Sequence, residues 1–272
     1  MSAAAETAAG RVLIIAGSDS GGGAGIQADI KTVTSLGGYA MTAITALTVQ
    51  DTLGVHGVWS APLEAVLGQI DVTLSDIGAD AIKTGMLGTA ALVEAVAERL
   101  SGVPDVARVI DPVMVATSGD RLVDDKAVGA IRAELIPGAT LVTPNAPEAE
   151  VLSGKAVETV DGQRRAAERL LEAGAKAALV KGGHIDGAVI VDVLQTQQGE
   201  WLFESPRIET TSTHGTGCTL ASACAAHIAQ GDPVQEAVER ARAYLQEAIR
   251  TAPGLGRGHG PVNHAWPLHK GD

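Results

Sequence analysis

The chain has 272 residues and a formal net charge of −12, and 46% of its residues are hydrophobic although only 2% are aromatic. This length suits one α/β domain, whose core must consist mainly of Ala, Val, Leu and Ile. The acidic balance argues against nucleic acid or an anionic membrane as the main partner. A phosphate can still bind where backbone N–H groups and lysines make a site locally positive.

We expect no signal peptide in the N-terminal stretch and no disulfide or metal site at the cysteines. Residues 1–10 contain an acid, no base and no sustained apolar run, so we expect a disordered tail rather than a signal peptide. No segment approaches roughly 18 apolar residues unbroken by glycine or charge, so no membrane span is expected. Cys218 and Cys224 have a spacing that suits neither a metal site nor a disulfide within one helix. These features predict a cytoplasmic protein.

Short apolar runs alternate along the chain with segments of helical periodicity. Strands are predicted at residues 11–17, 39–50, 80–86, 107–114, 139–145, 176–183, 188–196 and 200–206, the last two as a hairpin. Helices are predicted at residues 24–37, 63–77, 90–100, 124–136, 161–175, 215–231 and 233–252. This alternation predicts a single α/β domain over residues 11–272, with a mainly parallel sheet covered on both faces. Ligands bind such sheets at the carboxyl ends of the strands.

A first glycine-rich loop, "AGSDSGGGAGIQAD", separates the first strand from the first helix. Gly23, Gly25 and Ala28 satisfy the G-x-G-x-x-A pattern and Asp51 follows the next strand, so a dinucleotide-dependent oxidoreductase has to be considered. The loop is longer than the tight turn of that motif, and Asp29 adds negative charge next to the expected pyrophosphate. A flexible loop is the simpler alternative. A loop that holds a small polar substrate, with Asp29 accepting a hydrogen bond, fits the residues better.

A second glycine-rich stretch, "HGTGCTLASA", precedes a helix and is the stronger signal. Gly215 and Gly217 allow backbone N–H groups to converge, and the following helix adds the positive end of its dipole. Cys218 is then in the first helical turn, where we expect the pKa of the thiol to be lowered. The alternative for Cys218 is a small packed residue, which describes most free cysteines. Cys224, among alanines, is predicted to belong to the core.

Two acids, an amide and a lysine follow other predicted strands. Asp111 ends the run "VIDPVM", and Asn145 and Glu148 lie in "TPNAPEAE". Carboxylates and an amide at strand ends suit a Mg²⁺ ion that keeps several waters, although each residue alone could cap a helix or form a turn. Lys181, in "VKGGH", is a natural counter-charge for a phosphate. Together with the glycine-rich loops, this set favours phosphoryl transfer, which depends on positioning and charge neutralisation.

The motifs also resemble a known family in their order along the chain. They are "GSDSGGGAGIQADIKT", "TALTVQDT", "IKTGML", "DPVMVATSGD", "TPNAPEAE", "VKGGH" and "THGTGCTLASA". This series is similar to that of bacterial hydroxymethylpyrimidine and phosphomethylpyrimidine kinases of thiamine synthesis, members of the ribokinase-like superfamily. The resemblance covers nearly the whole chain from Arg11. Its most specific point is the cysteine of G-T-G-C, where sugar kinases of the superfamily have aspartate.

The resemblance implies a three-layer α/β/α sandwich and two successive ATP-dependent phosphorylations. The first acceptor is the hydroxymethyl group of 4-amino-5-hydroxymethyl-2-methylpyrimidine, and the second is the resulting monophosphate. By resemblance, Cys218 is the catalytic base, and the anion hole is formed by Gly215, Thr216 and Gly217. The residues that would contact the pyrimidine are Gln50, Asp29, Gly17, Met86 and Val113.

The resemblance also assigns the nucleotide end of the site. ATP would contact Lys181, Thr213 and Asn145, and Mg²⁺ would be held by Asp111 and Glu148, partly through water. The partners are small molecules, with no nucleic acid and no membrane, and a homodimer is possible because family members often form dimers. Other readings remain open: a pyridoxal or pyridoxine kinase of the same fold, and a non-catalytic pyrimidine sensor. The histidines near the C-terminus, His259, His264 and His269, are expected to belong to a solvated tail.

Overall fold

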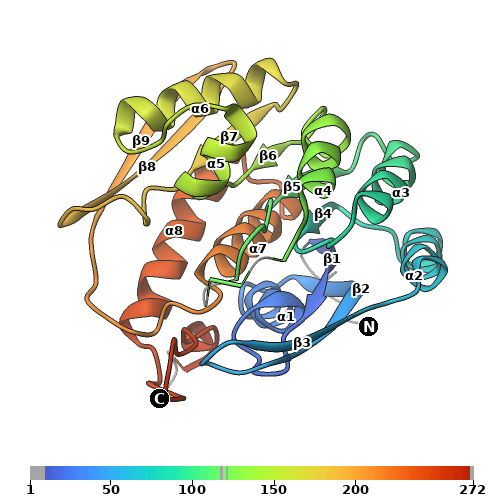
Figure 1. Ribbon diagram of the computed structural model, residues 1–272, viewed down its shortest axis with the longest axis horizontal. Helices are drawn as coiled ribbons and strands as arrows, with labels where there is room; N and C mark the ends of the chain where they lie inside the picture. The colour runs from blue at the N-terminus through green and yellow to red at the C-terminus, as the bar shows by residue number, and fades with distance from the viewer. Residues whose placement is uncertain (1–9, 117–118, 121, 270–272) are drawn as a thin grey trace, which may run out of the picture.

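The computed structural model describes residues 10–116, 119–120 and 122–269. Within this part of the chain, strands form one nine-stranded sheet in the order β3-β2-β1-β4-β5-β6-β7-β8-β9 (Figure 1). The strands are β1 (Arg11–Ser18), β2 (Tyr39–Gln50), β3 (Val55–Ser60), β4 (Ala81–Thr84), β5 (Ala107–Ile110), β6 (Leu141–Val142), β7 (Ala177–Val180), β8 (Val189–Thr196) and β9 (Gly199–Pro206). Neighbours from β2 to β7 pair in parallel, whereas β3, β8 and β9 are antiparallel to theirs. The predicted, mainly parallel sheet is confirmed.

Helices cover both faces of this sheet, so the predicted three-layer α/β/α architecture is confirmed as well (Figure 1). One layer consists of α1 (Gly25–Ser35), α7 (Thr216–Ala229) and α8 (Val234–Arg250). The other consists of α2 (Leu63–Asp76), α3 (Ala90–Ser101), α4 (Asp125–Ala130), α5 (Ala146–Ser153) and α6 (Val160–Glu172). A π-helical turn, Ile131–Leu135, continues α4, and a 3₁₀ turn, Trp266–His269, follows α8. Among the described residues, none of the helices is both long enough and apolar enough to cross a membrane.

One strand and one α-helix of the described residues were not predicted from the sequence. Strand β3 pairs with β2 at the edge of the sheet, and most of its residues are exposed, so it lacks the apolar run that marks a buried strand. Helix α5 is short and begins within "TPNAPEAE", a stretch whose polar residues the sequence analysis assigned to ligand binding rather than to a helix. The boundary of the predicted tail also shifts by one residue: Gly10 is buried and its carbonyl accepts a hydrogen bond from the amide of Tyr39. Residues 1–9 lie outside the described part of the chain.

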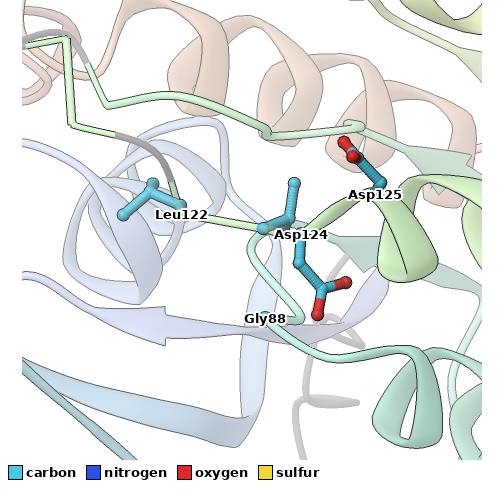
Figure 2. Close-up of a pocket in the computed structure, with 5 residues that line it drawn as sticks. Gly88, Leu122, Asp124 and Asp125 are labelled. Atoms are coloured by element: carbon cyan, nitrogen blue, oxygen red, sulfur yellow. The ribbon is translucent and has the colours of Figure 1, made fainter.

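Several helices begin at side chains that accept hydrogen bonds from the first turn. Thr89 caps α3, Thr159 caps α6, and Asp124 accepts from the amide of Ala127 at the start of α4. Figure 2 shows Asp124 at the beginning of α4, where a hollow of about 410 Å³ opens. Because the Asp124 carboxylate is already engaged as a cap, this hollow supplies little free chemistry.

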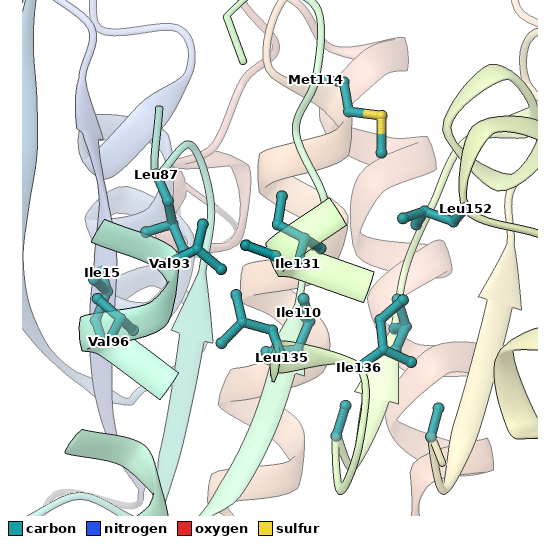
Figure 3. Packing of buried hydrophobic residues seen from close by; sticks show 14 of the residues in the cluster. Ile15, Leu87, Val93, Val96, Ile110, Met114, Ile131, Leu135, Ile136 and Leu152 are labelled. Atoms are coloured by element: carbon teal, nitrogen blue, oxygen red, sulfur yellow. The ribbon is translucent and has the colours of Figure 1, made fainter. Parts of the chain in front are cut away.

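The hydrophobic core has two parts, one on each face of the sheet. In β1 the side chains alternate, so that Leu13 and Ile15 pack toward the layer of α2 and α3 while Val12 and Ile14 pack toward α7 and α8. Figure 3 shows the first part, where side chains from sheet and helices interdigitate. Cys224 is fully buried in the second part, as predicted. Both faces of the central strands are therefore covered by helices and closed to ligands.

Candidate active site

A large cavity of about 1050 Å³ opens at the carboxyl ends of the parallel strands. Its wall is assembled from the segments that follow β1, β2, β4, β5, β6 and β7 and from the start of α7. The predicted site residues that border it are Gly17, Gln50, Met86, Asp111, Val113, Asn145, Glu148, Lys181, Thr213, Gly215, Thr216, Gly217 and Cys218. The structure thus brings together residues that are up to about 200 positions apart in the sequence.

The exception is Asp29, and its predicted place in the substrate pocket is wrong. Asp29 lies on the inner face of α1, none of its surface is exposed, and it does not border the cavity. Its carboxylate accepts hydrogen bonds from Lys83 Nζ at 3.0 and 2.9 Å and from Ser222 Oγ at 2.6 Å. Lys83, which the sequence analysis did not single out, borders the cavity in its place.

The turn before α7 is built around a glycine that no other residue can replace without strain. Gly215 has a φ of +78°, and a Cβ at this position would lie 1.9 Å from the carbonyl oxygen of Gly23. The two glycine-rich loops therefore pack directly against each other. At Gly217, a Cβ would lie 3.2 Å from Lys181 Nζ. Because the first N–H groups of a helix lack intrahelical acceptors, the amides of Gly217 and Cys218 are available to an anion beside this ammonium.

The first glycine-rich loop uses its amides internally. The Asp19 carboxylate accepts hydrogen bonds from the amides of Gly21, Gly23 and Ala24 at 2.8 to 3.0 Å, and from His214 Nε2 at 2.8 Å. Burial raises the pKa of Asp19, but the hydrogen bonds from His214 and from the backbone amides lower it by more. The pKa of Asp19 is therefore below its usual value. The amides of Gly21, Gly23 and Ala24 are therefore not free to bind a dinucleotide pyrophosphate.

Asp19 and His214 are site residues that the sequence analysis missed. Both border the cavity, and their hydrogen bond ties the loop after β1 to the turn before α7. His214 Nε2 also lies 3.5 Å from the side-chain nitrogen of Gln50. An aspartate two residues before a glycine run is typical of a turn in which the carboxylate accepts nearby amides, and that signal could have identified Asp19.

Cys218 is half-buried at the start of α7, but its thiol is not activated in the way the sequence suggested. Burial raises the pKa of Cys218 to about 12, the charge of Lys83 lowers it, and the charge of Asp29 raises it again. The expected lowering of this pKa is therefore wrong, because desolvation outweighs the helix terminus and the lysine. At neutral pH the thiol rests in its protonated form.

The acidic pair borders the same cavity, and a Cβ on Gly217, next to the thiol in the chain, would lie 4.0 Å from Asp111 Oδ2. Asp111 directly follows β5, and its Oδ1 lies 3.5 Å from Lys181 Nζ, while its buried Oδ2 has no hydrogen-bond partner among the described residues. Burial raises the pKa of Glu148 to about 7, Lys181 lowers it, and Asp111 raises it. An unpartnered carboxylate oxygen next to a second carboxyl group fits a divalent cation, which would relieve both desolvation and repulsion.

Asn145 and Glu148 also have a structural task. They form a capping box at the start of α5, in which Asn145 Oδ1 accepts from the Glu148 amide and Glu148 Oε2 accepts from the Asn145 amide, both at 2.9 Å. Glu148 Oε1 lies 3.4 Å from the amide of Met114. The Nδ2 group of Asn145 remains available to a ligand.

The far end of the cavity is apolar and is bordered by a loop held in shape by one arginine. Side chains there include Ile190, Ile208, Leu245 and Ile249. Arg207 donates to the carbonyl oxygens of residues 183, 185 and 187 at 2.9, 2.6 and 2.8 Å. These bonds fix the loop after β7, and nothing in the sequence pattern indicated them.

The segment after α8 reaches the cavity. The expectation of a solvated tail is wrong for His264, which is buried, whereas His259 is exposed as expected. His259 borders the cavity, where its Nδ1 lies 3.2 Å from Thr213 Oγ1. His264 is buried, its Nε2 lies 3.0 Å from Thr219 Oγ1, and its carbonyl accepts from the Tyr244 hydroxyl at 2.6 Å. Burial lowers the pKa of His264 to about 4, so this imidazole is neutral. The side chain of His269 lies outside the described residues.

Comparisons with known proteins agree with this site. A family model described as phosphomethylpyrimidine kinase matches residues 19–263. The chain belongs to the phosphomethylpyrimidine kinase family. A hydroxymethylpyrimidine/phosphomethylpyrimidine kinase of Streptomyces coelicolor is 48% identical over 94% of this chain and 95% of its own length. The chain is therefore a phosphotransferase, as the resemblance in its motifs implied.

Two further proteins are similar to this chain, one in sequence and one in structure. A thiamine biosynthesis bifunctional protein of Geobacter sulfurreducens is 51% identical over 94% of this chain, which spans only 52% of that relative's length. A solved ADP complex of Bacillus subtilis pyridoxal kinase superposes with a TM-score of 0.88 at 37% identity, covering 95% of this chain and 99% of that one. The ribokinase-like fold is thereby confirmed.

Proposed function

We propose that the chain transfers the terminal phosphoryl group of ATP twice, in a step of thiamine synthesis. The first acceptor is the hydroxyl of 4-amino-5-hydroxymethyl-2-methylpyrimidine, and the second is the monophosphate, which becomes the pyrophosphate. The observation that carries this proposal is that one cavity contains the glycine turn, Cys218, Lys181 and the acidic pair Asp111 and Glu148. Phosphoryl transfer requires this combination of positioning and preorganised charge more than it requires covalent chemistry.

The pyrimidine would bind at the end of the cavity near β1 and β4. A Cβ on Gly17 would lie 2.6 Å from the methyl carbon of Met86, so the glycine lets Met86 lie across the pocket floor. Thr45 Oγ1 donates to the Met86 carbonyl at 2.7 Å and fixes this segment. Gln50 presents an amide that can both donate to and accept from the edge of a pyrimidine ring, and Val113 supplies an apolar wall.

The nucleotide would occupy the other end. Its base fits the apolar lining described above, and its phosphates would meet Lys181, Thr213 and Asn145 Nδ2. Asp111 and Glu148 would hold Mg²⁺, which would neutralise charge on the phosphates when bound. The amides of Gly217 and Cys218 would stabilise the phosphoryl group as it passes to the acceptor.

Cys218 would take the proton of the acceptor hydroxyl. An alcohol is too weak an acid to ionise at neutral pH, and a positioned base contributes about 10²- to 10⁴-fold. Because the thiol is protonated at rest, its proton must first leave for solvent through the open cavity.

A pyridoxal kinase is the second candidate, favoured by the close superposition on Bacillus subtilis pyridoxal kinase. ADP release measured separately with hydroxymethylpyrimidine, its monophosphate and pyridoxal distinguishes the two. Turnover of both pyrimidines supports the proposal, and turnover of pyridoxal alone contradicts it. A non-catalytic sensor would release no ADP with any of the three, and it would have no use for the unpartnered Asp111 oxygen beside Lys181.

We further propose a cytoplasmic homodimer. Exposed apolar side chains gather on the β2–β3 hairpin, namely Leu47, Val49, Leu53, Val58 and Trp59. A patch of this kind at a sheet edge suits a second copy of the chain. Light scattering coupled to size exclusion tests this, and a monomer at micromolar concentration contradicts it.

A further inference from the structure

A buried lysine without a role in the proposed mechanism lies at the cavity floor. Lys83 is on β4, no part of it is exposed to solvent, and its atoms border the cavity. Its Nζ donates to both carboxylate oxygens of Asp29, and a Cβ on Gly85 would lie 3.1 Å from the same nitrogen. An ion pair of this kind is costly to desolvate and often stabilises a fold no better than apolar side chains of similar size. Its position beside the cavity therefore points to a role in the site.

The ion pair is fixed to the helix that bears the thiol. Ser222 Oγ donates to Asp29 Oδ1 at 2.6 Å. Ser222 is four residues after Cys218 on α7, so both side chains lie on the same face of that helix. Strand β4, α1 and α7 thus meet in one fully buried cluster, defined by Lys83, Asp29 and Ser222, on the face of α7 that bears the thiol, and Lys83 and Cys218 border the same cavity.

The charges that act on the Cys218 thiol come from several elements. Lys83 on β4 favours the thiolate, and so does the amide of the loop before α1 at Gly25. Asp29 on α1 and Asp111 after β5 disfavour it. In return, a thiolate stabilises the positive charges of Lys83 and of Lys181 after β7. Lys83 is the largest favourable charge for the thiolate, and the cluster holds it in place.

The two acceptors of the proposed function, on which this inference rests, make opposite demands on the thiol. An alcohol keeps its proton until transfer, so a base is needed. A phosphate monoester has a second pKa of about 6, so its attacking oxygen carries no proton at neutral pH. A thiolate next to this phosphate would add repulsion, whereas a neutral thiol would not.

We propose that Lys83, held by Asp29 and Ser222, is a positioning residue that stabilises the Cys218 thiolate for transfer to the alcohol, and that the phosphate acceptor meets the neutral thiol instead. In the first transfer, the thiol gives its proton to water, and the thiolate then takes the hydroxyl proton as the O–H bond breaks and S–H forms. The alcohol oxygen bonds to the γ-phosphorus, and the bond to the bridging oxygen breaks with its electron pair leaving on ADP. In the second transfer, a phosphate oxygen attacks directly and the S–H bond stays intact.

The test compares kcat on the two acceptors for Lys83→Met and for the charge-neutral pair D29N/K83M. We expect the ratio of kcat on the alcohol to kcat on the phosphate to fall about 10²-fold or more in Lys83→Met. In D29N/K83M the ratio should fall by less, because the loss of the Asp29 charge, which disfavours the thiolate, partly offsets the loss of Lys83. The matched control is Lys181→Met, which removes the other lysine of the cavity. It should slow both transfers, and the ratio should change by less than about tenfold. An equal loss on both acceptors in the Lys83 variants overturns the proposal.

A second measurement does not depend on turnover. In a Cys224→Ala background Cys218 is the single thiol, and its rate of alkylation by iodoacetamide against pH reports its ionisation. We expect Lys83→Met to move the midpoint upward by about one unit, which is about tenfold slower alkylation at a fixed pH below it. An unchanged midpoint overturns the proposal. If Lys83→Met does not fold, D29N/K83M gives a test in the same direction, because it buries no unpaired charge. Its expected upward shift is smaller, since it also removes the Asp29 charge that disfavours the thiolate.

These two measurements separate this inference from the proposed function. If the wild-type chain turns over neither pyrimidine, the proposed function fails. The alkylation midpoint then still decides whether Lys83 stabilises the thiolate.

Discussion

Gly215→Ala should disable the site through a single added methyl group. The new Cβ would lie 1.9 Å from the carbonyl oxygen and 2.8 Å from the carbonyl carbon of Gly23. The two loops must therefore separate by more than about 1 Å, and a displacement of that size at a reacting centre can cost about 10²-fold in rate. Alanine at a φ of +78° adds strain of about 1–3 kcal/mol. We expect kcat to fall about 10²-fold or more and the free energy of unfolding to fall by about 1–3 kcal/mol.

The assay is ADP release with hydroxymethylpyrimidine, combined with urea unfolding. Gly68→Ala is the matched control, because Gly68 lies within α2 and an added Cβ meets nothing within 4 Å. It should leave kcat unchanged and raise the stability by up to about 1 kcal/mol. If Gly215→Ala keeps turnover within about threefold of wild type, the packing of the two glycine loops does not position the reaction.

Three further predictions concern single side chains. Cys218→Ala should reduce turnover of the alcohol about 10²- to 10⁴-fold while calorimetry gives an unchanged affinity for ATP, and near-full turnover would make the cysteine a packing residue. The raised pKa of Glu148, about 7, means that the folded state favours its protonated form, so stability is lost as pH rises from the ordinary carboxyl range through 7. Glu148→Gln keeps the capping box. Measured by urea unfolding without divalent cations, its free energy of unfolding should exceed that of the wild type by up to about 3 kcal/mol at pH 8 and by almost nothing at pH 4.5. An equal increase at both pH values contradicts this. Arg207→Met removes the hydrogen bonds that hold the loop at 183–187. It should raise KM for ATP on the order of tenfold with a smaller change in kcat. A loss of kcat with unchanged KM would instead mean that Arg207 acts in the phosphoryl-transfer step.

Much of the fold follows from local sequence pattern. The buried run of β1 and the periodicity of α8 predict their elements because both faces of a parallel strand, and one face of a surface helix, must be apolar. Strand β3 gives no such signal, since an exposed edge strand needs pairing with β2 but little hydrophobicity. The length of α5 depends on its capping box, which the residues of "TPNAPEAE" contain but which we interpreted as ligand chemistry.

The site could be predicted where a polar residue directly follows a buried strand. Asp111 and Lys181 are polar residues directly after buried runs, and the parallel topology brings such positions together. The prediction that Asp29 contacts the substrate failed because a carboxylate close to a glycine loop can face either the ligand or the core. Its orientation is decided by Lys83 and Ser222, which lie 54 and 193 positions away. The pKa of Cys218 depends likewise on burial, which only the assembled fold determines.

The most direct test of the account is ADP release by the wild-type chain with Mg²⁺ and ATP, with hydroxymethylpyrimidine and its monophosphate supplied separately. We predict turnover of both acceptors, with the pyrophosphate as the final product. Turnover of neither acceptor by folded protein would contradict the assignment of the cavity as a two-step kinase site.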